Sequence, residues 1–371
     1  MILLSTIIGL FEAELLAQYQ DRLLPSHRAA LAAMKNCRTS ASPMMLAQCT
    51  DSDHKILLPH SCGHRSCPHC QHHESQQWLE RQLQKLVPGQ YFLVTFTLPA
   101  AFRALAFANQ STFFSLLIQC AWQTLSTFAL NDKQLQGTPG AIAVLHTHSR
   151  RLDFHPHVHL VVPAAAIDAN NRLWRTKRAK AKKGYLFNHK ALAKVFRAKM
   201  LDAITSEGLP LPERYAEKWV VDCKCLGSGE KALVYLGRYL YRGVIREKDI
   251  IACENGQVTF RYKQAKSGRT KTPTLPGAKF LWLILQHVLP KGFRRARNFG
   301  FLHPNSKRLI AVVQYLFGFD PKPALAFLKP RPEIKSPRCG APMKIIQTRI
   351  IPSLSASPPV PIGATAGAAV M

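Results

Sequence analysis

Three histidines alternate along the segment LDFHPHVHLVVP, which ends at Pro163. In a β-strand, successive side chains point to opposite faces, so His155, His157 and His159 share one face and the apolar residues between them share the other. Neutral imidazoles with this spacing are suitable ligands for a divalent cation. The segment alone is almost equally compatible with a strand that exposes its histidines to solvent.

A second group of reactive side chains lies in GSGEKALVYLGRYLYRG, residues 227–243. The interval has helical periodicity, with Ser228 as a suitable N-cap and Gly243 as a suitable C-terminal stop. Its candidate side chains are Tyr235, Tyr239, Arg238 and Arg242. The two tyrosines are four residues apart and share a helix face, and the two arginines form a stripe beside them. Paired tyrosines on an apolar helix are usually core residues, but neighbouring guanidinium groups favour phosphate binding.

Together the histidines and tyrosines predict a chemical reaction. A tyrosine has a pKa near 10, so only about a thousandth of it is phenolate at neutral pH, and it needs activation to attack a phosphodiester. A divalent cation held by histidines would polarise the phosphate and stabilise the charge that develops on it. The combination therefore predicts a metal-dependent DNA nickase that acts through a phosphotyrosine.

Five of the ten cysteines lie between Cys37 and Cys70, and short spacings favour a metal site over disulfides and hence a reducing compartment. The run SCGHRSCPHC contains a CPHC segment with the shape of a zinc knuckle. The predicted structural zinc ligands are Cys49, Cys62, Cys67 and Cys70, with His54 or Cys37 as substitutes. The fourth ligand stays open between these residues.

These motifs, in this order, resemble the two-tyrosine HUH transposases of the insertion-sequence 91 family. The HUH motif is His157-Val158-His159, and the tyrosine pair Y-x3-Y is Tyr235 to Tyr239. The resemblance extends through the SCxxxxCPxC run, YFLVTFTLP and HVLPKGFRRARNFGFL, and covers roughly residues 20–318. Family members usually carry C-x2-C where this chain has Cys49-Thr-Asp-Ser52, which is one reason why the fourth zinc ligand stays open.

The resemblance implies an α+β fold. Residues 1–90 would form a helical zinc-binding, DNA-recognition module, residues 91–320 an HUH antiparallel sheet flanked by helices, and residues 321–371 a disordered tail rich in proline and alanine. The implied activity is single-strand nicking and rejoining at element ends through a 5′-phosphotyrosine, which supports rolling-circle-like transposition. Mg²⁺ or Mn²⁺ would occupy the HUH site; histidine suits manganese better, and His155 is the candidate third ligand.

The charge balance predicts a nucleic-acid partner. Lysine and arginine total 50 against 21 acids, a formal net charge of +29. Eleven cations and no acid lie between residues 172 and 200, interleaved with aromatic side chains that suit unpaired bases. The predicted DNA-binding residues are Arg238, Arg242, Arg175, Lys177, Arg178, Lys182, Lys183, Arg294 and Arg295. No uninterrupted apolar run reaches the length of a membrane span, so we expect a cytoplasmic, nucleoid-associated protein that is compatible with an oligomer on DNA.

Local patterns predict the elements that position these side chains. We expect two helices within residues 12–36 that meet at Pro25, a helix over 74–86, a strand over 91–99, and a mostly helical stretch over 102–130. Strands follow at 141–148 and 154–163, and Asn255-Gly256 predicts a tight type I′ hairpin within 250–262. The N-terminal run MILLSTIIGLF is expected to be a structural or frayed segment, and the chain is expected to lack order from about residue 331.

Two other functions fit the same sequence. A rolling-circle replication initiator or a conjugative relaxase would share the histidines and a tyrosine. A non-catalytic zinc-dependent DNA-binding protein would share the cysteines and the basic surface, with its tyrosines in the core.

Overall fold

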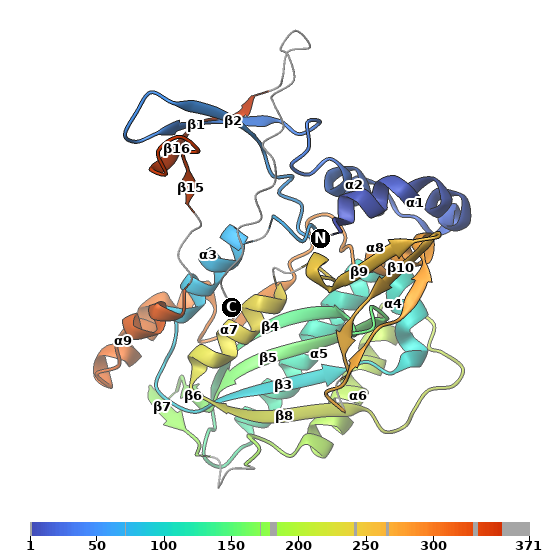
Figure 1. Ribbon diagram of the computed structural model, residues 1–371. Helices are drawn as coiled ribbons and strands as arrows, with labels where there is room; N and C mark the ends of the chain where they lie inside the picture. Colours follow the sequence, from blue (N-terminus) through green and yellow to red (C-terminus); the bar gives the residue numbers. More distant parts are fainter. Residues whose placement is uncertain are drawn as a thin grey trace.

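A large antiparallel sheet lies at the centre of the computed structural model (Figure 1). The structure describes residues 2–70, 72–170, 172–178, 184–240, 243–264, 267–328 and 333–350, without the side chains of His72, Arg238 and Tyr239. The sheet order is β7-β6-β4-β5-β3-β8, with β14 also paired to β4. Its strands are β3 (Tyr91–Thr97), β4 (Thr138–His148), β5 (Phe154–Pro163), β6 (Ala165–Asp168), β7 (Leu173–Thr176), β8 (Val220–Gly227) and β14 (Ala296–Gly300).

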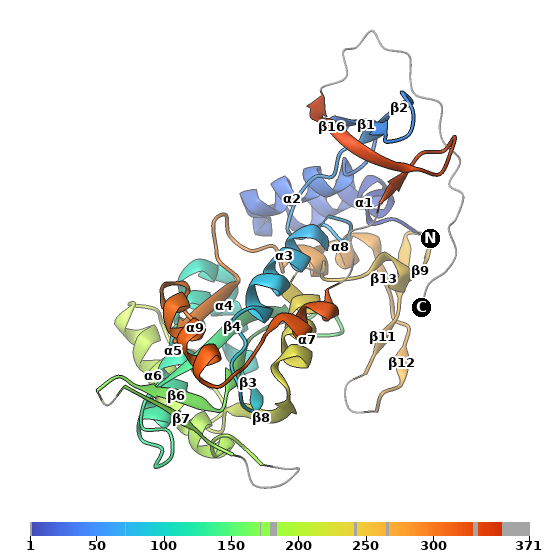
Figure 2. The same cartoon turned by 90° about the vertical axis from the view of Figure 1, so that its left-hand side faces the viewer.

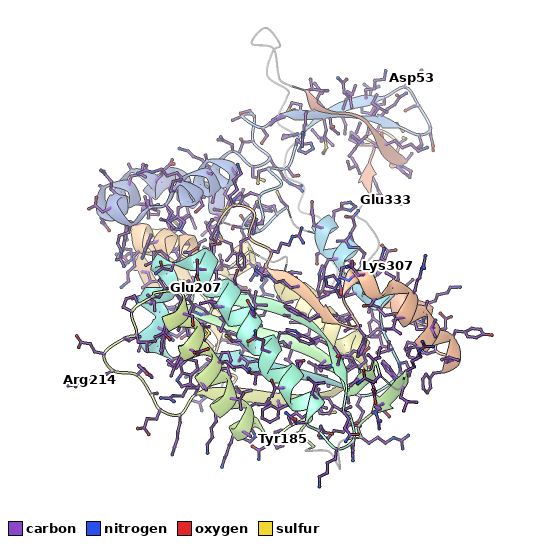
Figure 3. All side chains as sticks on the ribbon, turned by 180° about the vertical axis from the view of Figure 1, so that it is seen from behind. Asp53, Tyr185, Glu207, Arg214, Lys307 and Glu333 are labelled. Atoms are coloured by element: carbon purple, nitrogen blue, oxygen red, sulfur yellow. The ribbon has the colours of Figure 1, made fainter. Side chains whose placement is uncertain are left out.

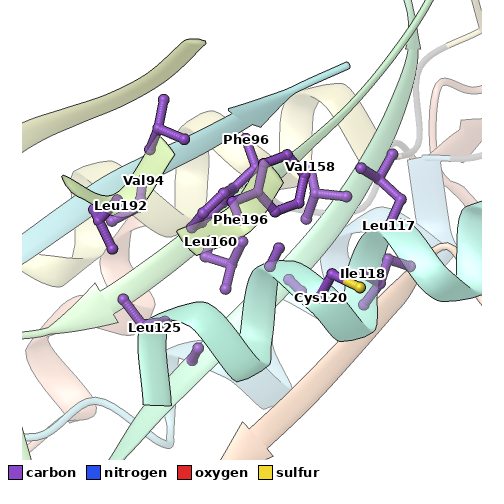
Figure 4. Close-up of a cluster of buried hydrophobic side chains, with 14 of the residues drawn as sticks. Val94, Phe96, Leu117, Ile118, Cys120, Leu125, Val158, Leu160, Leu192 and Phe196 are labelled. Carbon is purple, nitrogen blue, oxygen red and sulfur yellow. The ribbon is translucent and has the colours of Figure 1, made fainter. Parts of the chain in front are cut away.

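One face of this sheet packs against helices and forms the largest core. Alternate residues of β5, such as Val158 and Leu160, lie in one cluster with apolar side chains of α5 (Gln110–Leu130) and α6 (His189–Ser206) (Figure 4). Helix α4 (Arg103–Ala108) also packs on β5. By length and mean hydropathy α5 could span a membrane, but half of that window is buried, and its apolar side chains belong to this core. The opposite alternation of β5 brings the histidines to the other face, as the sequence predicted.

That other face is covered by α7 (Gly229–Leu240) and α3 (His72–Leu83), which pack on each other and bury Leu233 and Leu236 against the sheet (Figures 1 and 2). The expected histidine strand and tyrosine helix therefore form as predicted and lie on the same side of the sheet. A further helix, α9 (Lys307–Leu316), and the 3-10 turn η5 (Lys322–Phe327) follow β14.

The N-terminal helices form a second core with a distant part of the chain. α1 (Leu4–Tyr19) continues into η1 (Gln20–Arg22), and α2 begins at Pro25, as predicted. Leu4, Ile7 and Ile8 are buried, so the N-terminal run is a structural helix. The other members are α2 (Pro25–Lys35), α8 (Gly277–Leu285), β9 (Ile250–Glu254), β10 (Gln257–Phe260), β13 (Thr274–Pro276) and β11 (Tyr262–Lys263). β11 pairs with the exposed strand β12 (Thr270–Lys271). The expected boundary at residue 90 therefore does not separate two independent cores.

The hairpin between β9 and β10 has the predicted turn. Asn255 and Gly256 have φ values of 49° and 74°, and both lie in the left-handed region that a type I′ turn requires. The two-residue loop pairs Glu254 with Gln257 directly. This turn was readable from the sequence because the conformation it needs depends only on the two residues themselves.

A small four-stranded sheet corrects the expectation of a disordered tail. It contains β1 (Met44–Cys49), β2 (Lys55–Pro59), β15 (Ile334–Lys335) and β16 (Pro342–Ile350), in the order β15-β16-β1-β2. β16 pairs antiparallel with β1, so residues 333–350 are ordered by a partner almost 300 positions away. Local composition cannot reveal such a partner, which is why the prediction was wrong here. Residues 351–371 lie outside the described residues.

We predict that Gly300→Ala destabilises the protein strongly. Gly300 ends β14 with φ of 57°, and an added Cβ would lie 1.7 Å from the Pro139 carbonyl oxygen. We expect a loss of about 3 kcal/mol in urea unfolding, from the left-handed backbone and the clash together. Gly256→Ala is the matched control, because its φ is also positive but a Cβ there meets no atom within 4 Å. Equal losses for the two variants would contradict the clash.

Candidate active site and zinc centre

Three histidines from two adjacent strands form a cluster on the sheet face beneath α7. The side chains are His146 of β4 and His157 and His159 of β5, and their ligand nitrogens all lie within 4.8 Å of one another. His146 pairs directly with His157 across the two strands, and its ring centroid lies 4.3 Å from that of His159. The strand register therefore assembles a three-nitrogen site from residues that the sequence separates by a turn.

Hydrogen bonds orient two of these rings. The His157 Nδ1 lies 2.7 Å from the His155 carbonyl oxygen, which can only accept, so Nδ1 carries the proton and Nε2 faces the cluster as a ligand. The His159 Nδ1 lies 2.9 Å from the hydroxyl of Thr95 on β3. Both contacts fix the orientation of a ring that could ligate a metal, and the carbonyl contact also fixes the tautomer of His157.

Burial keeps all three imidazoles neutral. It lowers the pKa of His157 to about 4 and that of His159 to about 3, and the nearby His157 adds to the effect on His159. The pKa of His146 is also far below its usual value, first through burial and then through the nearby His159, His157 and Arg295. Neutral imidazoles have lone pairs to donate, so the cluster fits a divalent cation at neutral pH.

The structure places His155, the predicted third ligand, outside this cluster. Its Nδ1 instead accepts a hydrogen bond from Arg103 at 3.0 Å, and the cluster contains His146 in its place. The signal for His146 was present in AIAVLHTH, where His146 and His148 alternate in a strand. It was missed because only the pairing of β4 with β5 shows that His146 faces His157.

The tyrosine helix α7 lies over this histidine face. It contacts β3, β4, β5 and β8, and its buried side is formed by Ala232, Leu233 and Leu236. Tyr235 projects from the edge of this apolar side and is 40% exposed. Tyr239 and Arg238 lie on the same helix, but their side chains, and Arg242 as a whole, lie outside the described residues.

One guanidinium group links the tyrosine helix α7 to β4, the strand that carries His146. Arg295 donates from Nε to the carbonyl oxygen of Leu145 at 2.9 Å, and from its NH1 group to the carbonyl oxygen of Leu240 at 3.1 Å. Leu145 directly precedes His146, and Leu240 directly follows Tyr239. Arg295 was predicted to bind DNA; in the structure its side chain bridges the two motifs, and its contact with DNA stays a prediction.

A cavity of about 290 Å³ opens beside Arg295, between β4 and the end of α7. Its polar lining comes from the cysteine segment, β4, the loop after α8 and the loop before β14: Arg65, Ser66, Thr147, His148, His287, Arg294 and Arg295. His287 donates from Nε2 to the Leu152 carbonyl oxygen at 2.9 Å and packs against His148. Arg294 is exposed at the rim. The sequence did not predict His148 or His287, because no local pattern joins them.

Four cysteines converge beside this cavity, which Arg65 and Ser66 of the cysteine segment also line. Cys37, Cys62, Cys67 and Cys70 have all their sulfurs within 4.8 Å of one another. The closest sulfur pair, Cys37 and Cys70, is 3.3 Å apart, and two further pairs are 3.6 Å apart. Tetrahedral zinc with Zn–S bonds of about 2.3 Å separates its sulfurs by about 3.8 Å, so the four thiols fit a closed structural site.

The structure places Cys49, one of the predicted zinc ligands, outside this cluster. Its sulfur lies 3.5 Å from that of Cys339 in the small sheet. His54 lies in the turn between β1 and β2 and also stays outside the cluster. Cys37, named only as a substitute, supplies the fourth thiol, because it follows α2 and the second core brings the end of that helix to the knuckle.

Comparisons with known proteins agree with this arrangement. The family described as "Transposase zinc-binding domain" matches residues 7–98, and the one described as "Putative transposase" matches residues 140–309. A "Putative transposase y4qJ" of Sinorhizobium fredii is 34% identical over 76% of this chain and 75% of its own length. The chain belongs to the insertion-sequence 91 family of transposases.

Two further similarities are weaker. The transposase for insertion sequence element IS801 of Pseudomonas savastanoi is 28% identical over 67% of this chain and 63% of its own. The conjugative relaxase TrwC in complex with oriT DNA is 14% identical over 62% of this chain and 73% of its own, with a TM-score of 0.26, too low to carry a functional conclusion.

The predicted DNA-binding cations of this transposase fall into different environments. Arg175 pairs with Asp168 at 3.1 Å, and Lys177 pairs with Asp132, so neither is an isolated surface charge. Arg178 and Arg294 are exposed. Lys182 and Lys183 lie outside the described residues. The charge of the sequence predicted that these cations bind DNA, and this stays a proposal at most of these positions.

We predict that Arg295→Lys lowers the activity of the transposase at least tenfold while the protein stays folded. Lysine keeps the positive charge but cannot donate to two carbonyl oxygens in the fixed fork of a guanidinium group, so α7 loses its anchor to β4. The yield of protein–DNA adduct at saturating DNA is the measurement, with circular dichroism as the folding check. Arg214→Lys is the control, because Arg214 is exposed and lines neither this cavity nor its surroundings, and we expect nearly full yield from it.

Proposed function

We propose that this transposase cuts and rejoins single-stranded DNA at the ends of its element through a 5′-phosphotyrosine intermediate. The observation that carries the proposal is the Arg295 side chain, which joins the residue before His146 to the residue after Tyr239. It supports a site in which a three-histidine cluster and a tyrosine pair act on the same phosphate.

The proposed reaction is a substitution at phosphorus. The phenolic oxygen of Tyr235 or Tyr239 forms a bond to the phosphorus, and the bond from phosphorus to the 3′-oxygen breaks. The phenol gives up its proton, and the departing 3′-oxygen takes up a proton and leaves as a hydroxyl. A 3′-hydroxyl of the same or a partner strand then attacks the phosphorus, which re-forms a phosphodiester and releases the tyrosine with its proton. The second tyrosine forms the corresponding link to the other strand.

The residues of the site have separate roles in this proposal. His146, His157 and His159 would hold Mg²⁺ or Mn²⁺, which when bound polarises a phosphate oxygen and stabilises the developing charge. Their neutral state, caused by burial, keeps three lone pairs directed at that position. Three imidazole ligands favour manganese over magnesium on ligand preference. Arg295 holds the tyrosine helix in place.

A basic groove supports a path for the DNA strand. A hollow of about 1080 Å³ between α3, β14 and α9 shares Trp78, Arg294 and Ala296 with the smaller cavity that Arg295 lines. Its cations are Arg81, Lys85, Arg294, Arg297 and Lys307, and its described lining contains no acid. Burial and the charges of Lys307 and Arg81 lower the pKa of Lys85. A crowded group of cations without acids is typical of a phosphate-binding surface.

We predict that His146→Ala abolishes adduct formation and that His155→Ala retains most of it. Both changes remove an imidazole from adjacent strands, but only His146 belongs to the cluster. The measurement is a denaturant-resistant adduct between the protein and end-labelled single-stranded DNA of an element end, with Mn²⁺. Tyr235→Phe with Tyr239→Phe should also abolish the adduct.

An adduct that survives the double tyrosine change would rule out the proposed nucleophiles. A wild-type protein that binds the DNA but never forms an adduct would favour the alternative of a non-catalytic zinc-dependent DNA-binding protein. A replication initiator or relaxase would form the same adduct, and cutting at both ends of an element followed by strand joining distinguishes a transposase from these.

We predict that Arg81→Ala with Lys85→Ala weakens single-stranded DNA binding and lowers its salt dependence. Each lost phosphate contact reduces the slope of log affinity against log salt by about 0.7, so the pair should reduce it by about 1.4. Arg214→Ala with Lys218→Ala is the control for charge, since Figure 3 places Arg214 on the side of the molecule opposite Lys307. An equal change in both double variants would mean that the groove has no special role.

A further inference from the structure

A two-stranded ribbon, formed by β11 and β12, projects from the second core (Figure 2). Tyr262 pairs directly with Lys271 at the base of the ribbon. The pairing continues toward the tip, where the Gln264 amide donates to the Arg269 carbonyl oxygen at 2.9 Å. Tyr262 is partly buried against the second core, and the other described residues of the ribbon are exposed. The ribbon therefore adds little to the core and presents nearly all of its side chains to solvent.

The ribbon carries positive charge and no negative charge. Its sequence, YKQAKSGRTK, contains four cations and no acid. Lys263, Arg269 and Lys271 are exposed, and none of them forms an ion pair with the part of the chain that the structure describes. By contrast Arg261, just before the ribbon, pairs with Asp249. Exposed cations that repel one another without a neutralising acid are typical of a surface that binds a polyanion.

The strand pairing places two amide- and guanidinium-bearing side chains on one face of the ribbon. Residues directly opposite each other in an antiparallel pair share a face, and neighbours along a strand alternate. Gln264 and Arg269 therefore share a face with Lys271, and Lys263 lies on the other face. The Ser267 hydroxyl donates to Gln264 Oε1 at 3.0 Å and accepts from the Arg269 amide at 3.3 Å, which orients the glutamine. Glutamine and arginine are the side chains that pair bidentately with the base edges of adenine and guanine.

The shape and composition of the ribbon fit duplex DNA better than a single strand. Single strands are held in grooves where bases stack on aromatic side chains. The only aromatic residue in the ribbon sequence is Tyr262, which packs toward the core beside Phe260. The major groove of B-DNA is about 12 Å wide and admits a two-stranded ribbon. In such a groove one face of the ribbon reaches the base edges, and the lysines beside it reach the phosphates.

The ribbon is attached close to the strands that carry the histidine cluster. Arg150, in the loop between β4 and β5, donates to the Lys263 carbonyl oxygen at 3.1 Å. Leu152 of the same loop is buried in the second core, from which the ribbon projects. A duplex that binds the ribbon is therefore held at the end of the two strands that carry His146 and His157.

We propose that the β11–β12 ribbon enters the major groove of a base-paired segment beside the single strand that is cut. Gln264 and Arg269 contact base edges, and Lys263 and Lys271 contact phosphates. This rests on the proposed function for the cut itself and adds a second form of DNA to the substrate. The ribbon selects the element end by its duplex, and the histidine and tyrosine site acts on the adjoining single strand.

The first test compares two probes by fluorescence anisotropy: a single strand of the element end, and the same strand with about one helical turn of complement annealed on either side of the cleavage site. We expect the wild type to bind one of the partly duplex probes about tenfold more tightly than the single strand at the same salt concentration. Lys263→Ala with Lys271→Ala should lose most of this advantage and keep the affinity for the single strand. Arg214→Ala with Lys218→Ala removes the same charge from exposed positions outside the ribbon and should keep the advantage.

The second test separates base reading from phosphate contact. On partly duplex probes with single base-pair changes, Arg269→Ala should lose a preference of about tenfold at one or two neighbouring base pairs. Lys271→Ala should instead weaken the binding of all these probes by a similar factor. A loss for Arg269→Ala that is uniform over all sequences would overturn the assignment of this residue to base edges.

The two proposals fail in different ways. Equal affinity of the wild type for the single strand and for both partly duplex probes overturns the role of the ribbon, whether or not an adduct forms. An equal loss on all probes in the Lys263 and Lys271 variant overturns it too, because the contact would then be with the single strand. A preference for a partly duplex probe without any adduct would overturn the proposed cleavage and support the ribbon as a duplex-binding element.

Discussion

The two hydrogen bonds of the Arg295 guanidinium group hold the site together. They reach backbone carbonyl oxygens on β4 and at the end of α7, so they fix one element against the other without depending on any other side chain. The backbone of Arg295 contributes as well, since its carbonyl oxygen accepts from the Leu145 amide. Strand β14 begins at the next residue and pairs with β4. It ends at Gly300, which lies close to the Pro139 backbone. The position of the tyrosine helix relative to the histidines is therefore set by backbone groups of β4 and α7 that bind the residue just before β14.

Burial determines the chemistry that this frame can support. The histidine cluster lies between the sheet and α7, where desolvation disfavours the imidazolium form and lowers the pKa of each ring. The same burial brings Arg295 close enough to add to the effect on His146. A cationic side chain next to three neutral imidazoles suits an anionic phosphate, and a protonated cluster would not hold a metal ion. The geometry and the electrostatics thus favour the same reaction.

The cysteine segment, residues 62–70, contacts the parts of the chain that position the tyrosine helix and Arg295. Ser66 and Pro68 pack so closely against Gly243 that an added Cβ there would lie 3.1 Å from Pro68. Arg65 donates to the Phe293 carbonyl oxygen at 2.9 Å, two residues before Arg295. His69 pairs with the buried Glu247, which also accepts from the first amide of α1. The four-cysteine site therefore braces both the chain that follows α7 and the loop that carries Arg295.

The sequence by itself determined the groups of residues whose arrangement depends only on local backbone geometry. His157 and His159 share a face because strands alternate, Tyr235 and Tyr239 share a face because helices repeat every 3.6 residues, and the CPHC run makes a turn through its own residues. Asn255-Gly256 is of the same kind. Only the tertiary structure decided the partners that complete each group: His146 in place of His155, Cys37 in place of Cys49, and Cys339 beside Cys49. These choices depend on strand register and on contacts between distant segments, and a linear pattern holds no information about which side chain a neighbouring strand will place opposite.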